Sequence, residues 1–180
     1  MRALIERWIR ERRHVLIYGE AATGKTHLAY QFFLEAARAG LEPVMLATEP
    51  GTITFLSHIG APYEPVMTMD SLASSVTEHA LKGRYIIVDS LNWHYRENPG
   101  IEGARLLGYI ASVLHETGGL STAQVSADAQ WPSGAPYIMP YAHVVARTSR
   151  GRRGFLLSLL KPVRRTGMFR LTSRGGVEWV

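Results

Sequence analysis

The chain has 180 residues, of which 46% are hydrophobic, and a formal net charge of +5 at neutral pH. This length suits one globular domain with a continuous core, spanning 1–180. The absence of cysteine excludes disulfides and thiolate metal sites, and agrees with a reducing cytoplasm. We therefore expect a cytoplasmic protein, and we expect no membrane partner because no transmembrane pattern occurs.

The first 125 residues show an alternation of strand and helix patterns. An amphipathic helix at 1–13 comes first, with Leu4, Ile5, Trp8 and Ile9 on one face. The pattern then predicts strand 14–18, helix 25–39, strand 44–48, a short helix near 52–59, an extended piece at 65–69, helix 71–81 capped by Asp70, strand 85–89, a loop through Pro99, helix 102–117 and strand 120–125. This order predicts an α/β fold whose nucleotide-binding core, 14–125, has a mostly parallel sheet flanked by helices.

The remainder of the chain has a different character. Residues 126–140 are rich in Pro, Ser, Gly and Ala, and predict a long mobile loop. Beyond it, strands are expected at 142–148, 154–161, 168–171 and 177–180, separated by turn signals. We expect these C-terminal strands, within 141–180, to form an antiparallel extension of the sheet.

A phosphate-binding loop follows the first strand. Residues 19–26 match the pattern G-x-x-x-x-G-K-[ST], with a strand before it and a helix after it, as such a loop requires. Successive backbone N–H groups and the positive end of the helix would cradle phosphates, Lys25 would reach the β and γ phosphates, and the Thr26 hydroxyl would ligate Mg²⁺. The predicted cofactors are ATP and Mg²⁺. The predicted binding residues are Gly19, Glu20, Ala21, Ala22, Thr23, Gly24, Lys25, Thr26 and His27.

Two acidic residues complete the predicted site. Asp89 ends the apolar strand 85–89, where it would hold Mg²⁺ beside Thr26. Glu49 follows the strand 44–48 at the same carboxyl edge, where ligands bind in such sheets. We predict it to be the general base that activates water, and the alternative is a solvated turn residue before Pro50.

Charge is distributed unevenly along the chain. Residues 1–13 hold five Arg and two Glu, residues 14–140 hold six basic and twelve acidic residues, and residues 141–180 hold nine basic residues and one acid, Glu178. The basic C-terminal part is a candidate nucleic-acid surface. The alternative is that Arg147, Arg150, Arg152 and Arg153 only solvate a hairpin.

Taken together, these segments resemble the RecA/RadA recombinase superfamily, and among its members the short archaeal RadB-type paralogues. The resemblance rests on the phosphate loop, on Ala47-Thr48-Glu49, on the stretch from Ile87-Val88-Asp89-Ser90-Leu91 to Tyr95-Arg96, and on Ala123-Gln124-Val125. It spans nearly the whole chain and implies a RecA-like ATPase core.

The resemblance also implies roles for individual residues. Lys25, Thr26, Asp89 and Glu49 match the family's phosphate, metal and water-activating residues, and Gln124 matches its sensor of the γ phosphate. Lys161 and Arg164 resemble cations that act in trans on a neighbour's ATP, which requires a homo-oligomer. The segments 93–100 and 126–140 match the two DNA-facing loops. Arg96 joins the other four candidate arginines as a phosphate contact, and Trp131, Tyr137 and Tyr141 could stack on bases or pack on the core.

Three functional hypotheses remain open at this point. The first is an ATPase, DNA-stimulated or weak, that acts in DNA recombination or repair in an accessory or regulatory role. Its partners would be single- or double-stranded DNA and a recombinase or other repair protein. The second is a KaiC-like signalling ATPase acting through protein partners. The third is a small phosphate-loop kinase, for which no lid or acceptor pocket is evident.

Overall fold

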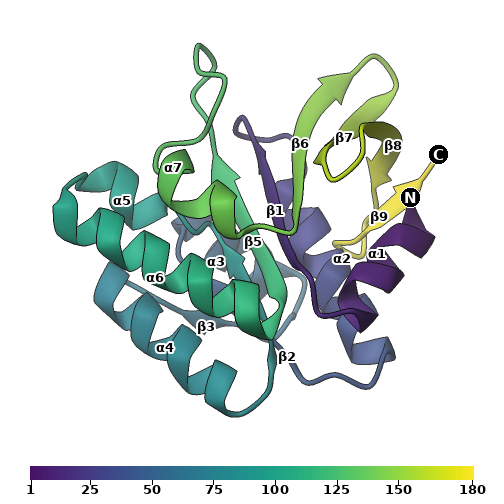
Figure 1. Cartoon of the computed structure of the whole chain (residues 1–180). Helices are drawn as coiled ribbons and strands as arrows, with labels where there is room; N and C mark the ends of the chain where they lie inside the picture. Colours follow the sequence, from purple (N-terminus) through teal and green to yellow (C-terminus); the bar gives the residue numbers. More distant parts are fainter.

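The computed structural model describes residues 1–180, which form a single nine-stranded sheet with helices on both faces (Figure 1). The strand order is β3-β2-β4-β5-β1-β6-β7-β8-β9. The helices are α1 (Arg2–Arg10), α2 (Lys25–Arg38), α3 (Pro50–His58), α4 (Met69–Leu81), α5 (Trp93–Glu97), α6 (Ile101–Thr117), α7 (Ala135–Ile138) and the 3₁₀ helix η1 (Met139–Tyr141). The strands are β1 (His14–Gly19), β2 (Pro43–Ala47), β3 (Glu64–Pro65), β4 (Tyr85–Asp89), β5 (Gly119–Gln124), β6 (Val144–Gly151), β7 (Gly154–Lys161), β8 (Arg165–Leu171) and β9 (Val177–Trp179).

Two apolar clusters hold the layers together, one on each face of the sheet. On one face α1, α2 and α3 contribute side chains such as Ile9, Phe32 and Leu56. On the other, α4, α6 and α7 contribute side chains such as Val76 and Ile110. Strands β1 and β4 are buried along their whole length, because helices cover both faces of a parallel sheet and leave no strand face exposed to solvent. None of the helices combines the length and the hydropathy that a membrane span requires.

The predicted fold class is confirmed, with four local differences. The N-cap of α4 is Thr68, whose hydroxyl accepts from the Ser71 N–H in a capping box, so the prediction of Asp70 as the cap is wrong. Strand β6 pairs in parallel with β1 and belongs to the core, so the prediction of an antiparallel strand at 142–148 is wrong. The antiparallel extension begins at β7. The segment predicted as a loop through Pro99 contains α5. The predicted loop 126–140 is shorter, because α7 and η1 occupy its end and Ile138 is buried.

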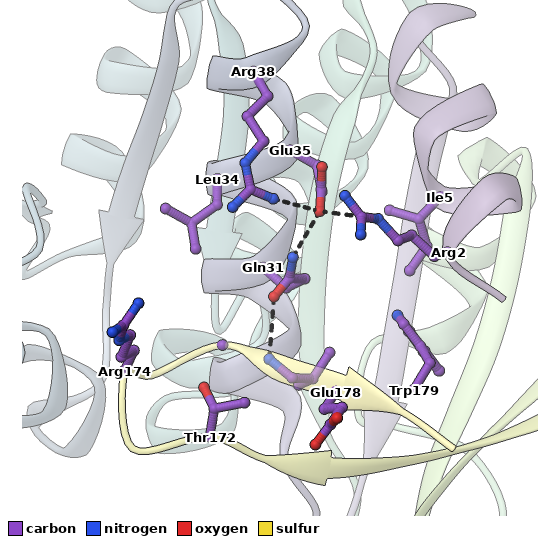
Figure 2. A pocket seen from close by; sticks show the side chains of 12 residues that line it. Arg2, Ile5, Gln31, Leu34, Glu35, Arg38, Thr172, Arg174, Glu178 and Trp179 are labelled. Atoms are coloured by element: carbon purple, nitrogen blue, oxygen red, sulfur yellow. Dashed lines mark hydrogen bonds and ion pairs between the residues drawn. The ribbon is translucent and has the colours of Figure 1, made fainter.

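The C-terminal strand is fastened to α2 by a polar chain (Figure 2). The Val177 N–H donates to Gln31 Oε1 at 3.1 Å, and Gln31 Nε2 donates to Glu35 Oε1 at 2.8 Å. The buried Glu35 carboxylate is paired with Arg38 at 2.8 Å and lies 3.7 Å from Arg2. Gln31 lies about two turns into α2. This series of hydrogen bonds therefore holds β8 and β9 beside the start of that helix, where the phosphate loop ends.

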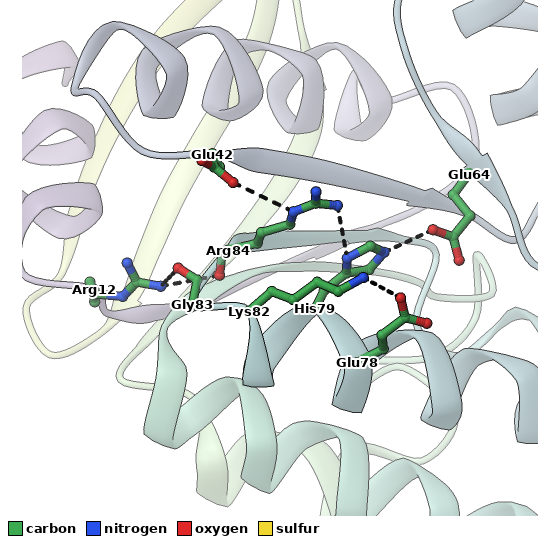
Figure 3. Close-up of polar contacts among 8 residues, drawn as sticks. All are labelled: Arg12, Glu42, Glu64, Glu78, His79, Lys82, Gly83 and Arg84. Atoms are coloured by element: carbon green, nitrogen blue, oxygen red, sulfur yellow. Dashed lines mark hydrogen bonds and ion pairs between the residues drawn. The ribbon is translucent and has the colours of Figure 1, made fainter.

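A second polar network lies at the amino end of the parallel strands (Figure 3). His79 of α4 contacts Glu64 of β3 at 2.8 Å through Nε2 and Arg84 at 3.2 Å through Nδ1. The Arg12 guanidinium donates to the Gly83 and Arg84 carbonyls. These contacts join helices and strands at the end of the sheet opposite the phosphate loop, so they stabilise the sheet without contributing to the phosphate loop.

Candidate nucleotide-binding site

The phosphate loop leaves β1 at Gly19 and enters α2 at Lys25. A Cβ on Gly19 would lie 2.2 Å from Thr148 Oγ1 and 2.6 Å from the Thr148 carbonyl oxygen, so only glycine fits beside β6. Gly24 has φ +85° and caps α2, and Ala22 also has a positive φ, 56°. A non-glycine residue in this region is strained, and such strain is concentrated at ligand-binding turns. The backbone N–H groups of 21–24 donate to no backbone carbonyl, which leaves a row of donors open to the pocket.

Lys25 and Thr23 fix the shape of this loop. Lys25 Nζ donates to the Gly19 carbonyl at 3.0 Å and to the Glu20 carbonyl at 2.7 Å. Thr23 Oγ1 donates to the Glu20 carbonyl at 2.8 Å and lies 2.7 Å from Thr148 Oγ1. Burial lowers the pKa of the Lys25 ammonium, and the Asp89 and Glu49 carboxylates oppose that change by stabilising the charged form.

Asp89 is held rigidly at the end of β4. It is 2% exposed, its Oδ2 accepts from Thr52 Oγ1 at 2.8 Å, and its Oδ1 accepts a short hydrogen bond from Thr122 Oγ1. Thr52 comes from α3 and Thr122 from β5, so three elements fix the direction of the carboxylate. A carboxylate held in this way is preorganised as a hard oxygen ligand for Mg²⁺, directly or through water.

Glu49 stands at the N-cap position of α3 and lines the same pocket. Burial raises the pKa of the Glu49 carboxyl above its ordinary value, and the neighbouring Asp89 carboxylate raises it further. The preceding residue, Thr48, accepts from the Ser90 N–H at 2.8 Å and donates to the Ser90 carbonyl at 2.7 Å. This pair of hydrogen bonds between the ends of β2 and β4 fixes the spacing of Glu49 and Asp89.

These groups converge on one cavity of about 450 Å³. Its polar lining includes the phosphate loop, Glu49, Asp89 and Gln124, and its apolar wall consists of Phe55, Phe155 and Leu171. The lining residues are Ala21, Ala22, Thr23, Gly24, Lys25, Thr26, His27, Glu49, Phe55, Asp89, Gln124, Arg150, Phe155 and Leu171. The polar floor suits phosphates and the apolar wall suits a flat heterocycle. A larger cavity of about 530 Å³ between α1, α2 and β9 contains none of these residues.

Not all predicted binding residues gather here. Gly19 and Glu20 form the loop without lining the cavity, whereas Arg150, predicted as a DNA contact, lines it. Arg96 is half-buried, and its Nη1 is buried without a partner. Its positive charge helps to lower the pKa of Lys25, after burial and the Asp89 and Glu49 carboxylates, and that of Glu49, after burial, Asp89, the Ser90 hydrogen bond and Lys25. These two arginines therefore lie at or near the nucleotide pocket.

The other predicted cations lie apart from the pocket. The Arg147 guanidinium carbon is 6.0 Å from the centre of the Tyr18 ring, whose other neighbour is Trp131 at 5.9 Å. Arg152 and Arg153 are exposed in the turn between β6 and β7. At the opposite edge of the sheet, Lys161 Nζ donates to the Ala142 carbonyl at 2.6 Å, and Arg164 is exposed beside it. Lys161 and Arg164 thus cannot serve their own chain's pocket, and any role on ATP requires a neighbouring copy.

Three contributors were missed at the level of sequence. Thr52 and Thr122 orient Asp89, and the fully buried Asn92 bonds to the end of β5. Thr122 lies within the buried strand β5, and Asn92 lies three residues after the end of the apolar strand β4. Their partners, however, are 33 and 32 residues away, and spacing alone does not reveal them.

Comparison with known proteins supports the fold. The sequence matches no protein-family profile. No curated protein is similar to it in sequence. Among solved structures, the flagellar accessory protein FlaH from Methanocaldococcus jannaschii is similar, with a TM-score of 0.70, 15% identity, and coverage of 94% of this chain and 89% of that chain. At this identity the likeness concerns the fold alone, and it agrees with the RecA-like architecture.

Proposed function

We propose that this protein is an ATPase of the RecA superfamily that binds Mg·ATP in the cavity beside the phosphate loop. The observation that carries the proposal is the convergence of three separate strand ends on one cavity: Lys25 and Thr26 after β1, Glu49 after β2, and Asp89 at the end of β4. Structural ion pairs alone would not require a loop with open N–H donors, a strained Ala22 and two acids around one lysine.

Each residue has a defined task in this proposal. The N–H groups of 21–24 and the Lys25 ammonium bind phosphate oxygens, and the Thr26 hydroxyl and Asp89 hold the metal ion. When bound, Mg·ATP supplies the phosphoanhydride bond that is cleaved. Glu49 accepts the proton of the attacking water, and its raised pKa makes it a stronger base than an exposed glutamate.

We further propose that the ATPase acts on DNA in an accessory role, as a RadB-like protein. The support is chemical: nine basic residues and one acid occupy 141–180, and Arg152 and Arg153 are exposed in the turn of the hairpin whose Arg150 and Phe155 line the pocket. Arg147 of β6 and Trp131 of the loop after β5 flank the Tyr18 ring, and a cationic group beside stacking groups suits single-stranded DNA.

A second candidate is an accessory ATPase that works through a protein partner. The fold similarity to FlaH, described as a flagellar accessory protein, favours this alternative. It predicts nucleotide-dependent association with a protein or with further copies of this chain, in which Lys161 and Arg164 would face a neighbour's ATP.

Steady-state ATP hydrolysis with and without single-stranded DNA separates these candidates. Lys25→Ala and Glu49→Gln serve as inactive controls. A DNA-associated ATPase binds DNA or is stimulated by it, and the effect declines as salt rises. Turnover that is abolished by both substitutions but indifferent to DNA at low and moderate salt favours the protein-partner candidate. Turnover that survives both substitutions contradicts the proposed site.

A further inference from the structure

Asn92 is a fully buried side chain whose hydrogen-bonding capacity is completely used. Its Oδ1 accepts from the Gln124 N–H at 3.0 Å and from Ser90 Oγ at 3.1 Å. Its Nδ2 donates to the Gln124 carbonyl at 2.9 Å and to the Ser133 carbonyl at 3.2 Å. An asparagine amide offers two acceptor and two donor sites, and all four are occupied here. The reversed amide would oppose N–H to N–H and oxygen to two carbonyls, so the network fixes its orientation.

The partners of Asn92 are the two ends of one loop. Gln124 is the last residue of β5, and Ser133 comes just before α7. Between them, Val125 and Pro132 are buried, whereas 126–128 and 130–131 are exposed. One amide group therefore holds the two ends of the loop 125–133 together. Residues 126–128 at its tip are exposed, whereas Trp131 lies beside the Tyr18 ring at 5.9 Å. Loops with close, fixed ends and a free tip are a common form of functional loop.

Asn92 is also connected to the nucleotide pocket. Ser90, which donates to Asn92, is tied by two hydrogen bonds to Thr48, the neighbour of Glu49. On the other side, the Gln124 side chain lines the pocket while both of its backbone polar groups are held by Asn92. The next residue, Val125, donates its N–H to the carbonyl of Gly19 at 3.1 Å. Hydrogen bonds thus connect Thr48 through Ser90 and Asn92 to both ends of the loop 125–133, and the two acids adjoin this network as the chain neighbours of Thr48 and Ser90.

We propose that Asn92 is the positioning residue that couples the nucleotide pocket to the loop 125–133. This proposal rests on the proposed ATPase function, and it identifies the loop 125–133 as the element that responds to the nucleotide. A change at Gln124 on binding a γ phosphate moves a residue whose backbone is hydrogen-bonded to Asn92, and a change at Glu49 reaches Asn92 through Thr48 and Ser90. Because the same amide group also donates to the Ser133 carbonyl, the change reaches the far end of the loop 125–133. Buried networks of this kind have few alternative arrangements, which suits a two-state element.

Hydrogen exchange of the 125–133 amides tests this coupling. The proteins are wild type, Asn92→Asp, Asn92→Ala and the matched control Asn98→Asp, which alters the exposed asparagine after α5. Asn92→Asp keeps both acceptor bonds and loses the donors to Gln124 and Ser133. Each protein is measured with Mg·ADP and with a non-hydrolysable Mg·ATP analogue, and its affinity for the analogue is measured by calorimetric titration.

In wild type and Asn98→Asp we expect the loop amides to exchange at least about fivefold more slowly with the ATP analogue than with ADP, the lower end of ordinary coupling factors. In both Asn92 variants we expect that ratio to fall below about twofold, with analogue affinity within about threefold of wild type. A purely structural role would speed exchange equally in both nucleotide states and leave the ratio intact.

Two results would overturn the inference. One is a wild-type protein that binds the analogue but shows no difference between nucleotides in this loop, an outcome that does not depend on any variant folding. The other is an Asn92 variant that retains the wild-type ratio. If the titration shows no affinity of the wild type for the analogue, the ATPase proposal fails and the inference with it, and this outcome is distinguishable because binding is measured separately.

Discussion

Gly19→Ala perturbs the point where the phosphate loop leaves β1. The added methyl group would lie 2.2 Å from Thr148 Oγ1, 2.6 Å from the Thr148 carbonyl and 2.9 Å from Thr23 Oγ1. The carbonyl belongs to β6, which pairs with β1 through Gly19 and Thr148 themselves, so it cannot retreat without disturbing the register. Overpacking of a well-packed core costs about 1–3 kcal/mol, and we expect the upper end of that range here.

Urea unfolding followed by circular dichroism measures the effect as a lower midpoint at unchanged slope. Gly51→Ala is the matched control, because Gly51 lies in α3 with nothing within 4 Å of the added methyl group. It should be neutral or stabilise the protein by up to about 1 kcal/mol, the difference in helix propensity. Because Gly19→Ala also displaces the loop amides, ATP affinity should fall at least about tenfold, or about 1.4 kcal/mol. A Gly19→Ala protein with wild-type stability and affinity would refute the close packing described here.

Three further predictions concern side chains in and outside the pocket. Glu49→Gln should bind ATP normally but lower kcat by about 10²–10⁴-fold, the usual contribution of a general base. Because burial and Asp89 raise the Glu49 pKa, the wild-type kcat should begin to fall, as the solution is acidified, at a higher pH than an ordinary glutamate would give. The variant should lack this acid-side decline in kcat. Arg150→Gln should weaken ATP affinity by about twofold to fivefold, as expected for one exposed charge contact, whereas Arg153→Gln should not. Equal effects of the two substitutions would show that Arg150 makes no specific contact. Burial lowers the His14 pKa from 6.5 to about 4, so the unfolded chain binds a proton at a higher pH than the folded protein does. The free energy of unfolding should therefore fall by about 3 kcal/mol between pH 6.5 and pH 4. Urea titrations should find this loss diminished in His14→Gln.

The sequence was most informative where a local pattern determines the structure. Periodicity and glycine spacing predict the apolar strands 14–18 and 85–89, the phosphate loop between strand and helix, and the long helices. The structure contains all of them. Asp89 and Glu49 could be placed at one edge because parallel strands end on the same side. The confirmed fold class rests on these features.

Features that depend on contacts distant in sequence could not be predicted. The strand at β6 carries the same alternation whether it pairs in parallel or antiparallel, and only its position beside β1 decides between them. Thr52, Thr122 and Asn92 act through partners more than thirty residues away. Arginine charge was visible, but whether Arg150 faces the pocket or solvent depends on the path of the hairpin.

Calorimetric titration of Mg·ATP into wild type and Lys25→Ala tests the nucleotide site most directly. We expect one site per chain for the wild type, and at least about 100-fold weaker binding for the variant, since each charge-assisted hydrogen bond lost contributes about 1.5–3 kcal/mol. Absence of binding to the wild type, or equal binding to both proteins, would contradict the assignment of the cavity at the end of β1 as a site for Mg·ATP.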